Sequence, residues 1–289
     1  MLLDPFPPDL GGADDPAYPT MTPPDSMYPG QTRIPLGSPL DEIATPSMWS
    51  RLASPLERAL REMWLRLGLL ERNVPGQWVS LHYGRIAINA HGWERLRARF
   101  GGAEPDLSLV PLPRGVLDRI PERFERLHAR LRHRRLLKRL ERACTVREER
   151  LARARALPLE DLDAGELARG LLDDRAWTEI LLPWLGRRLE EGARDLPDSA
   201  LREAIALEQR SGAELGRRLE TRRVLTSPAE IAYLTVEERI RAVHDESSYW
   251  AALSGSRAAR VEKFTKVEIP VQFWGRPRTE GEDPEPLGY

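Results

Sequence analysis

The sequence has a single cysteine and no long apolar run, and each shortage excludes a class of protein. Cys144 alone cannot build a disulfide framework or a cysteine-rich metal site, which is typical of proteins in a reducing compartment. No run of about 18 apolar residues occurs, so we expect no membrane-spanning helix and no membrane partner. The start, from Met1 to Pro5, has neither the basic region nor the apolar core of a secretion signal. These features predict a cytoplasmic protein.

The chain also has almost no net charge. Its 289 residues include 44 basic and 45 acidic side chains, which give a formal net charge of -1 at pH 7. A protein this close to neutrality has no global field to attract nucleic acid, so we expect no nucleic-acid partner. The hydrophobic content of 41% is sufficient for a buried core. Any electrostatic recognition must therefore be local.

Proline is concentrated towards the two ends of the chain. Ten prolines interrupt any helical period in residues 1–40, which are also rich in glycine and aspartate. Such a segment buries too little apolar surface to offset its ordering entropy, so we expect a disordered or extended arm. Residues 275–289 repeat this composition with added acidic side chains and predict an acidic, Pro-rich tail. Residues 41–274 would then form the folded domain.

The hydrophobic spacing between these tails is mostly helical. One helix is expected to start at Pro55 with Ser54 as its N-cap, and a longer one over residues 121–157, ended by Pro158. Further helices are predicted over residues 164–182, 183–196, 198–223, 227–233, 236–244 and 246–267. Their expected N-caps are Asp163, Asp198, Ser227 and Thr235, the last in a capping box with Glu238.

One segment breaks the helical period. Residues 78–89 shift to nearly alternating apolar positions, with Tyr83-Gly84-Arg85 as an interruption. This pattern predicts a short strand or hairpin. The expected fold is therefore mainly α, an irregular multi-helix domain with a small β element near its N-terminal side and extended Pro-rich tails.

Four segments stand out when they are taken in order: Ala53-Ser54-Pro55-Leu56, Gly84-Arg85-Ile86-Ala87-Ile88-Asn89, Ala232-Tyr233-Leu234-Thr235-Val236-Glu237-Glu238 and residues 257–266. Together they resemble the middle region of phosphoenolpyruvate-synthase-like and rifampicin-phosphotransferase-like enzymes. This region begins with a proline-rich entry and a Thr/Ser-Pro-Leu element, continues with a Gly-Arg-x-Tyr-x-Asn strand, and later has a Phe-Tyr-Leu-Thr-x-Glu-Glu segment and an Arg-rich helix. Ala87 stands where the family has an aromatic residue. The resemblance covers residues 39–275.

The resemblance implies a part of a phosphotransfer machine. In the family, an ATP-grasp domain binds ATP and Mg²⁺, and a histidine on a swivelling domain carries the phosphoryl group. No histidine of this chain lies in the family's phosphohistidine motif, and no Gly-rich phosphate loop is present. We therefore expect no catalytic residue, cofactor or metal on this chain alone. The implied partners are ATP-grasp and phosphohistidine proteins and a small-molecule acceptor.

Two groups of side chains are candidates for binding. Alternate polar residues on the predicted strand would share one face and line a pocket, with nearby tryptophans as walls for an apolar ligand. This substrate-binding set comprises Tyr83, Arg85, Asn89, Trp49, Trp64 and Trp78. The second set is a basic stretch of the long helix that would contact a partner, and it comprises Arg130, Arg132, Arg134, Arg135, Lys138 and Arg139. An exposed strand face and a solvated helix face are the alternatives.

Two functions are compatible with these observations, and a decayed or truncated relative with no phosphotransfer partner is a third hypothesis. The first is a non-autonomous subunit of a split phosphotransferase that binds the acceptor or docks the catalytic chains. The second is a helical protein–protein adaptor with no small-molecule ligand. Trp177, Leu181 and Trp184 fall on one side of a predicted helix, where a core seam is favoured over an aromatic ligand cage.

Overall fold

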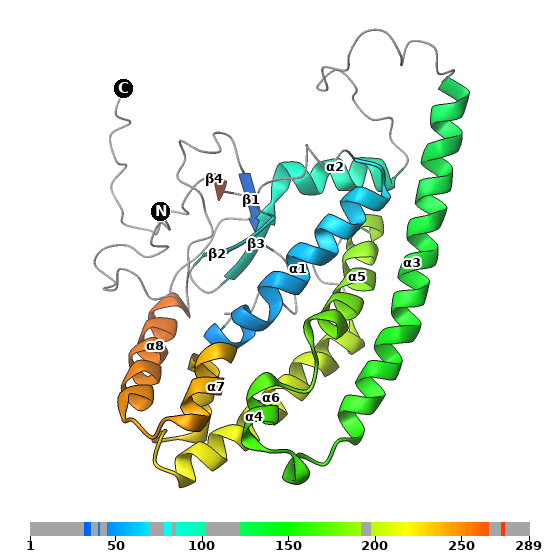
Figure 1. Ribbon diagram of the computed structural model, residues 1–289. Coiled ribbons are helices and arrows are strands. Elements are labelled where there is room, and N and C mark those ends of the chain that lie inside the picture. The colour runs from blue at the N-terminus through cyan, green and yellow to red at the C-terminus, as the bar shows by residue number, and fades with distance from the viewer. Residues whose placement is uncertain are drawn as a thin grey trace, which may run out of the picture.

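The computed structural model describes residues 32–35, 40, 45–69, 78–82, 85–101, 122–191, 198–265 and 273–274. Most of these residues lie in helices, which confirms the expected mainly α class (Figure 1). The predicted acidic tail over residues 275–289 and most of the predicted N-terminal arm lie outside the described residues. In the described part of the chain, no helix is long and apolar enough to cross a bilayer.

The first helix, α1 (Pro46–Arg66), begins earlier than expected. Thr45 is its N-cap, since the Thr45 side chain accepts a hydrogen bond from the Met48 N–H, and Pro46 takes the first helical position. The predicted start at Pro55, with Ser54 as the cap, was wrong. Pro55 lies inside the helix and is buried. An internal proline removes one backbone hydrogen bond, and here the packing of a long apolar face compensates for that loss.

The predicted hairpin is present and belongs to a larger sheet. Strands β2 (Val79–His82) and β3 (Arg85–Asn89) pair antiparallel, as expected. Strand β1 (Thr32–Pro35) pairs antiparallel with β3, and β4 (Phe273–Trp274) pairs with β1, which gives the order β2-β3-β1-β4. The end of the predicted N-terminal arm is therefore a strand, and it joins segments from both ends of the domain.

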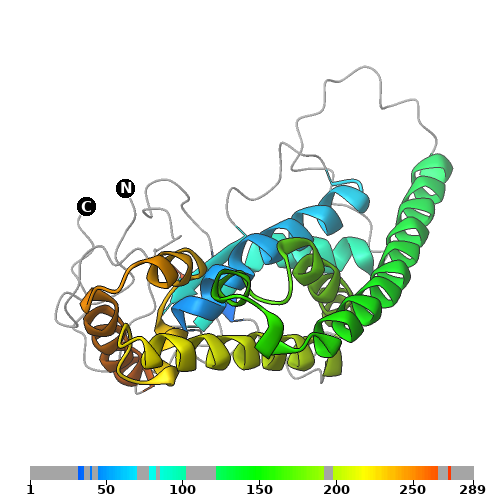
Figure 2. The same cartoon turned by 60° about the horizontal axis from the view of Figure 1, so that its bottom comes forward.

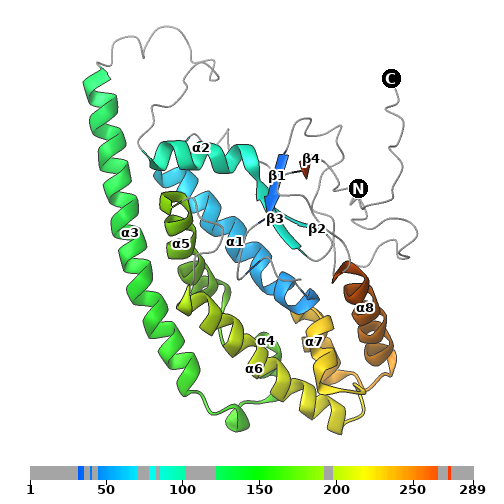
Figure 3. The same ribbon diagram turned by 180° about the vertical axis from the view of Figure 1, so that it is seen from behind.

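The long predicted helix is α3 (Glu122–Ala156), followed by the 3-10 turn η4 (Leu159–Asp161). A helix that sequence reasoning did not predict, α2 (Ala90–Phe100), follows directly after β3. Figure 3 shows α1 lying between α5 and the sheet, with α3 on the far side of α5.

The next predicted helices have a different boundary from the one expected. The chain forms α4 (Ala164–Arg169) and α5 (Asp174–Glu191), with the break at Gly170. Pro183, the predicted break, lies buried inside α5. Gly170 has φ +77° and ψ 166°, a conformation that is open almost only to glycine, so the backbone leaves the helix there.

The remaining elements agree with the sequence in order and capping. They are α6 (Ser199–Thr221), η5 (Pro228–Tyr233), α7 (Val236–His244) and α8 (Tyr249–Thr265). The four predicted N-caps, Asp163, Asp198, Ser227 and Thr235, are confirmed, because each side chain accepts a hydrogen bond from a backbone N–H of its own helix. Asp163 and Thr235 also form capping boxes.

Two hydrophobic cores share helix α6. The larger core joins α1, the hairpin, α3, α5 and the first half of α6, and it contains the predicted Trp177–Leu181–Trp184 seam, fully buried. The smaller core joins α4, the second half of α6, η5, α7 and α8. Figure 2 shows α6 running from the side of α3 to that of α7 and α8. Between its two apolar halves, α6 carries the buried polar residues Glu208 and Ser211.

Candidate functional site

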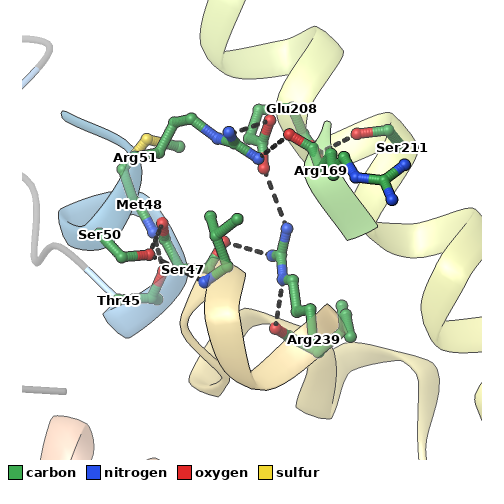
Figure 4. A network of polar contacts seen from close by, with 11 residues as sticks. Thr45, Ser47, Met48, Ser50, Arg51, Arg169, Glu208, Ser211 and Arg239 are labelled. Atoms are coloured by element: carbon green, nitrogen blue, oxygen red, sulfur yellow. Dashed lines mark hydrogen bonds and ion pairs between the residues drawn. The ribbon is translucent and has the colours of Figure 1, made fainter. Parts of the chain in front are cut away.

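A buried cluster of three charged side chains lies where α1, α6 and α7 meet. Arg51, Glu208 and Arg239 have side chains that are only 6%, 2% and 3% exposed. Arg239 Nη1 donates to Glu208 Oε1 at 2.9 Å, and Arg51 Nε lies 3.5 Å from Glu208 Oε2 (Figure 4). We call these residues the Arg51–Glu208–Arg239 cluster. Two guanidinium groups share one carboxylate, so the cluster has a formal charge of +1.

Arg239 connects the cluster to two further elements. Its Nε donates to the carbonyl oxygen of Ile231 in η5 at 3.2 Å, and its Nη2 donates to the Ser47 hydroxyl in the first turn of α1. Burial lowers the pKa of Arg239 below the usual arginine value; the charge of Glu208 opposes this effect, and the charge of Arg51 adds to it. Arginine stays protonated in proteins despite such shifts, so the site keeps its positive charge.

Arg51 ties the end of α4 to α1. Its Nη2 donates to the carbonyl oxygen of Arg169, the last residue of α4. Among the described residues, Arg51 Nε and Glu208 Oε2 have no hydrogen-bond partner, although the two atoms face each other. Charge therefore holds this side of the cluster without a well-formed hydrogen bond.

The lack of a side chain at Gly170 leaves space for the contact between Arg51 and Glu208. An ideal Cβ on Gly170 would lie 2.5 Å from both Arg51 Nη2 and Glu208 Oε2, closer than real contacts allow. The positive φ also disfavours any residue with a side chain. We expect Gly170→Ala to lower the free energy of unfolding by about 1–3 kcal/mol, measured by urea denaturation.

Gly101 provides the matched control for this substitution. It is also the C-cap of a helix, α2, but it has φ -70°, and a Cβ there would make ordinary contact with the Arg97 carbonyl at 3.4 Å. Gly101→Ala should therefore leave stability nearly unchanged. Equal losses in the two variants would show that Gly170 has no special steric role.

The segment leading into α7 is held by α1 on one side and by α8 on the other. The Val236 N–H donates to the Ser50 hydroxyl of α1 at 3.1 Å. Glu238 accepts the Thr235 N–H at 2.9 Å and two bonds from Arg257 of α8, at 2.6 and 2.9 Å. Arg257 is 1% exposed and also donates to the Tyr233 carbonyl at 2.9 Å. The capping box thus anchors a buried arginine as well as the helix start.

Glu238 should make stability depend on pH. Burial alone would raise the pKa of Glu238, but the hydrogen bonds from Arg257 and from Thr235, with the Arg257 charge, outweigh burial and lower it. A lowered folded pKa means that the carboxylate stabilises the fold above its unfolded pKa of about 4.3, and that this stability is lost as the pH falls through the folded pKa. Glu238→Gln should cost about 1–3 kcal/mol at neutral pH and lose less stability on acidification, as measured by denaturation at several pH values.

The neighbouring residue provides a control for the pH measurement. Glu237 is exposed in the same helical turn. Glu237→Gln should keep both the stability and the pH dependence of the original protein. A Glu238→Gln variant with an unchanged pH profile would contradict the assigned role of the carboxylate.

A pocket of about 440 Å³ opens beside the Arg51–Glu208–Arg239 cluster. Ser47, Glu208 and Arg239 form its polar wall, and Gln209 lies at the surface end. The other walls are mostly apolar side chains of α1, β3, α6 and η5, together with Leu40, and they include Met48, Leu52, Ile86, Ile205 and Ile231. Ligand pockets of about 300–1,000 Å³ with a few polar groups in an apolar lining are typical of small-molecule sites.

The five described residues of the predicted substrate-binding set do not line this pocket. The Asn89 side chain is buried and caps α2 by accepting the Gly92 N–H at 2.8 Å. Trp49, Trp64 and Trp78 are buried in the larger core, where Trp64 and Trp78 form an edge-to-face pair with ring centroids 5.3 Å apart. Arg85 is half-buried at the start of β3, and Tyr83 lies outside the described residues. The predicted hairpin contributes to the pocket through Ile86.

The predicted partner-binding residues divide into two groups. Arg139 is 15% exposed and is bound by Glu62 of α1 at 2.8 Å and Glu179 of α5 at 2.5 Å, so it links three helices inside the fold. Arg132 is half-buried. The remaining four side chains are exposed on α3: Arg130, Arg134, Arg135 and Lys138.

Sequence reasoning missed the cluster, although one signal marks its members. Arg51 lies between Ser47 and Pro55 on the buried side of α1, and Glu208 lies between Ala204 and Ser211 on that of α6. A charged residue in the middle of an apolar stripe requires a buried partner. Periodicity finds such residues, but it does not identify the partner on another helix.

No protein-family model matches the chain, and no curated protein or solved structure shows significant similarity to it. Within the described ranges, no group of three or more His, Cys, Asp or Glu side chains is placed to hold a metal ion.

Proposed function

We propose that this chain is a binding subunit of a split phosphoenolpyruvate-synthase-like phosphotransferase and that it holds the acceptor substrate. The observation that carries the proposal is the meeting of three segments, far apart in sequence, at one pocket. The helix containing Ser54-Pro55-Leu56 supplies Ser47 and Met48, the Gly84–Asn89 segment supplies Ile86, and the segment that leads into α7 supplies Ala232.

Two hydrogen bonds join the N-terminal part of α1 to α7. The first turn of α1 accepts hydrogen bonds from two groups of α7, through Ser50 to the Val236 N–H and through Ser47 to the Arg239 side chain (Figure 4). The partners in each bond are separated by more than 180 residues in sequence. Two of the resembling segments line the pocket, through Ile86 and Ala232, and the helix that contains Ala53-Ser54-Pro55-Leu56 lines it through Ser47, Met48 and Leu52. This proximity supports the proposal.

In this proposal the chain contributes positioning and its partners contribute chemistry. An ATP-grasp chain would bind ATP and Mg²⁺, and a phosphohistidine chain would carry the phosphoryl group to the acceptor. Holding an acceptor in a fixed orientation converts an encounter in solution into an intramolecular step, which is a large part of catalysis in phosphoryl transfer.

The exposed basic face of α3 favours a second candidate, a helical adaptor without a small-molecule ligand. Arg130, Arg134, Arg135 and Lys138 are exposed there, and Leu131 is 40% exposed beside them. A face with several exposed basic side chains is electrostatically complementary to an acidic protein surface. The same face would serve the first candidate as the docking site for a catalytic chain.

Reconstitution tests the proposal. The chain would be purified with proteins that associate with it in its native cell, and ATP-dependent phosphorylation of small molecules in a cell extract would be followed by mass spectrometry. We expect the associated proteins to include an ATP-grasp chain and a phosphohistidine chain, and turnover to require all three chains. Stable partners with neither domain would contradict the split-enzyme proposal.

Two tryptophan substitutions separate acceptor binding from docking. Ala213 and Ala206 are both exposed alanines of α6, but Ala213 lines the pocket whereas Ala206 does not. Ala213→Trp should block the pocket and abolish turnover in the reconstituted system, and Ala206→Trp should leave it unchanged. If both variants keep full turnover, the adaptor candidate is favoured over the acceptor-binding one.

A further inference from the structure

The pocket has a buried cation with unused donors. An arginine side chain has five N–H donors. Three of those on Arg239 have acceptors among the described residues, namely Glu208, Ser47 and the Ile231 carbonyl. One N–H on Nη1 and one on Nη2 therefore remain available at a side chain that is 3% exposed and lines the pocket.

The carboxylate in the same wall is already engaged. Glu208 directs Oε1 to Arg239 at 2.9 Å and Oε2 to Arg51 at 3.5 Å. Arg51, which does not line the pocket, and Arg239 share this one carboxylate. One positive charge of the cluster therefore has no counter-charge within the cluster. An uncompensated charge is costly in a buried site. An anionic group arriving from the pocket would supply both the missing charge and the missing acceptors.

A glycine keeps the approach to Arg239 open. Gly212 of α6 lines the pocket, and a Cβ at this position would lie 3.3 Å from Arg239 Nη2. Any larger side chain would occupy space next to that nitrogen. The rest of the wall is largely apolar, with Met48, Ile205 and Ile231 among its side chains. The pocket therefore presents donors at one point and apolar surface elsewhere.

We infer that the pocket binds a small molecule with an apolar body and one oxyanion group, a carboxylate or a phosphate, which Arg239 recognises. This inference deepens the proposed function, because it names the chemical class of the molecule held at the same site. The volume of about 440 Å³ lies within the range of about 300–1,000 Å³ that is typical of small-molecule pockets.

A series of eight-carbon probes tests the inference on the unmodified protein. Octanoate, octyl phosphate, octanol and octylamine share one apolar chain and differ in the charge of the head group. Binding would be measured by calorimetry and by the thermal stabilisation of the protein. We expect octanoate or octyl phosphate to bind at least about tenfold more tightly than octanol, and octylamine to bind most weakly. The tighter of the two anions identifies the preferred oxyanion.

Three substitutions test whether the probes bind in this pocket and whether Arg239 recognises their head group. Ala213→Trp should abolish binding of the anionic probes, and Ala206→Trp, on the same helix but outside the pocket, should not. Arg239→Gln should remove the advantage of octanoate over octanol. If this last variant fails to fold, the probe series on the unmodified protein still decides whether an anion is preferred.

The outcomes distinguish this inference from the proposed function. Equal affinities for octanoate and octanol would overturn anion recognition and leave the pocket as a binding site. Failure of every probe to bind, or binding that Ala213→Trp does not change, would overturn the inference as a whole. The split-enzyme proposal itself is decided separately, by the identity of the associated chains and by their joint turnover.

Discussion

Replacing Glu208 with glutamine is expected to lower the free energy of unfolding by about 3–5 kcal/mol. The substitution conserves the volume of the side chain, so it leaves no cavity. It removes the carboxylate charge that lies between Arg51 and Arg239, whose side chains are 6% and 3% exposed. Two guanidinium groups would then remain buried without a counter-charge, which costs more than the loss of an exposed ion pair. Urea denaturation followed by circular dichroism measures the difference.

Glu214 on the same helix provides the control. It pairs with Arg217 at 2.8 Å and with Arg218 at 2.7 Å, and these arginine side chains are 63% and 25% exposed. The Glu214 side chain is 18% exposed, so both pairs are partly solvated and contribute less than a fully buried pair. Glu214→Gln should therefore cost about 1 kcal/mol. A Glu208→Gln variant that is as stable as the control would show that the cluster is solvated in solution and does not join the helices.

The sequence predicts those parts of the fold that depend on local chemistry. The capping box at Thr235 and the caps at Asp163 and Asp198 are confirmed, because a side-chain oxygen can reach a backbone N–H three residues later without help from the rest of the fold. The hairpin and the long helix α3 are also confirmed, because hydrophobic periods of about 2 and 3.6 residues can be read from a local stretch of sequence.

The wrong boundaries share a physical cause. The sequence predicts helix boundaries at Pro55 and Pro183, but both residues lie inside helices and are buried. Each removes one hydrogen bond from its helix, whereas tertiary packing of the surrounding apolar side chains favours a continuous helix. The true break at Gly170 depends on a backbone conformation and on the buried neighbours Arg51 and Glu208, which local propensity does not contain.

The candidate site was harder to predict than the fold. The predicted pocket used polar residues of the hairpin and the tryptophans near it, but Asn89 caps a helix and Trp64 and Trp78 fill the core. The observed pocket takes its charged wall from Glu208 of α6 and Arg239 of α7, whose side chains meet only in the folded chain. Pairing of buried charges across helices is a property of the tertiary arrangement, so one sequence does not reveal it.

Gly216→Ala is expected to destabilise the protein by about 3 kcal/mol or more, because it forces backbone against backbone. An ideal Cβ on Gly216 would lie 2.2 Å from the carbonyl oxygen of Pro228 and 2.9 Å from its carbonyl carbon. Unlike a flexible side chain, the first residue of η5 cannot move without shifting the turn that follows. Alanine is the better helix former by up to about 1 kcal/mol, so the steric effect must exceed this gain. Thermal and urea denaturation measure the net result.

Gly255→Ala is the matched control and should have the opposite sign. Gly255 also lies inside a helix, α8, but a Cβ there would meet no atom within 4 Å. We expect this variant to be more stable by up to about 1 kcal/mol, the gain in helix propensity alone. The displaced turn in Gly216→Ala also carries Ile231, whose carbonyl accepts from Arg239, so probe binding should weaken with stability. A Gly216→Ala protein as stable as the control would contradict the close approach of α6 to η5.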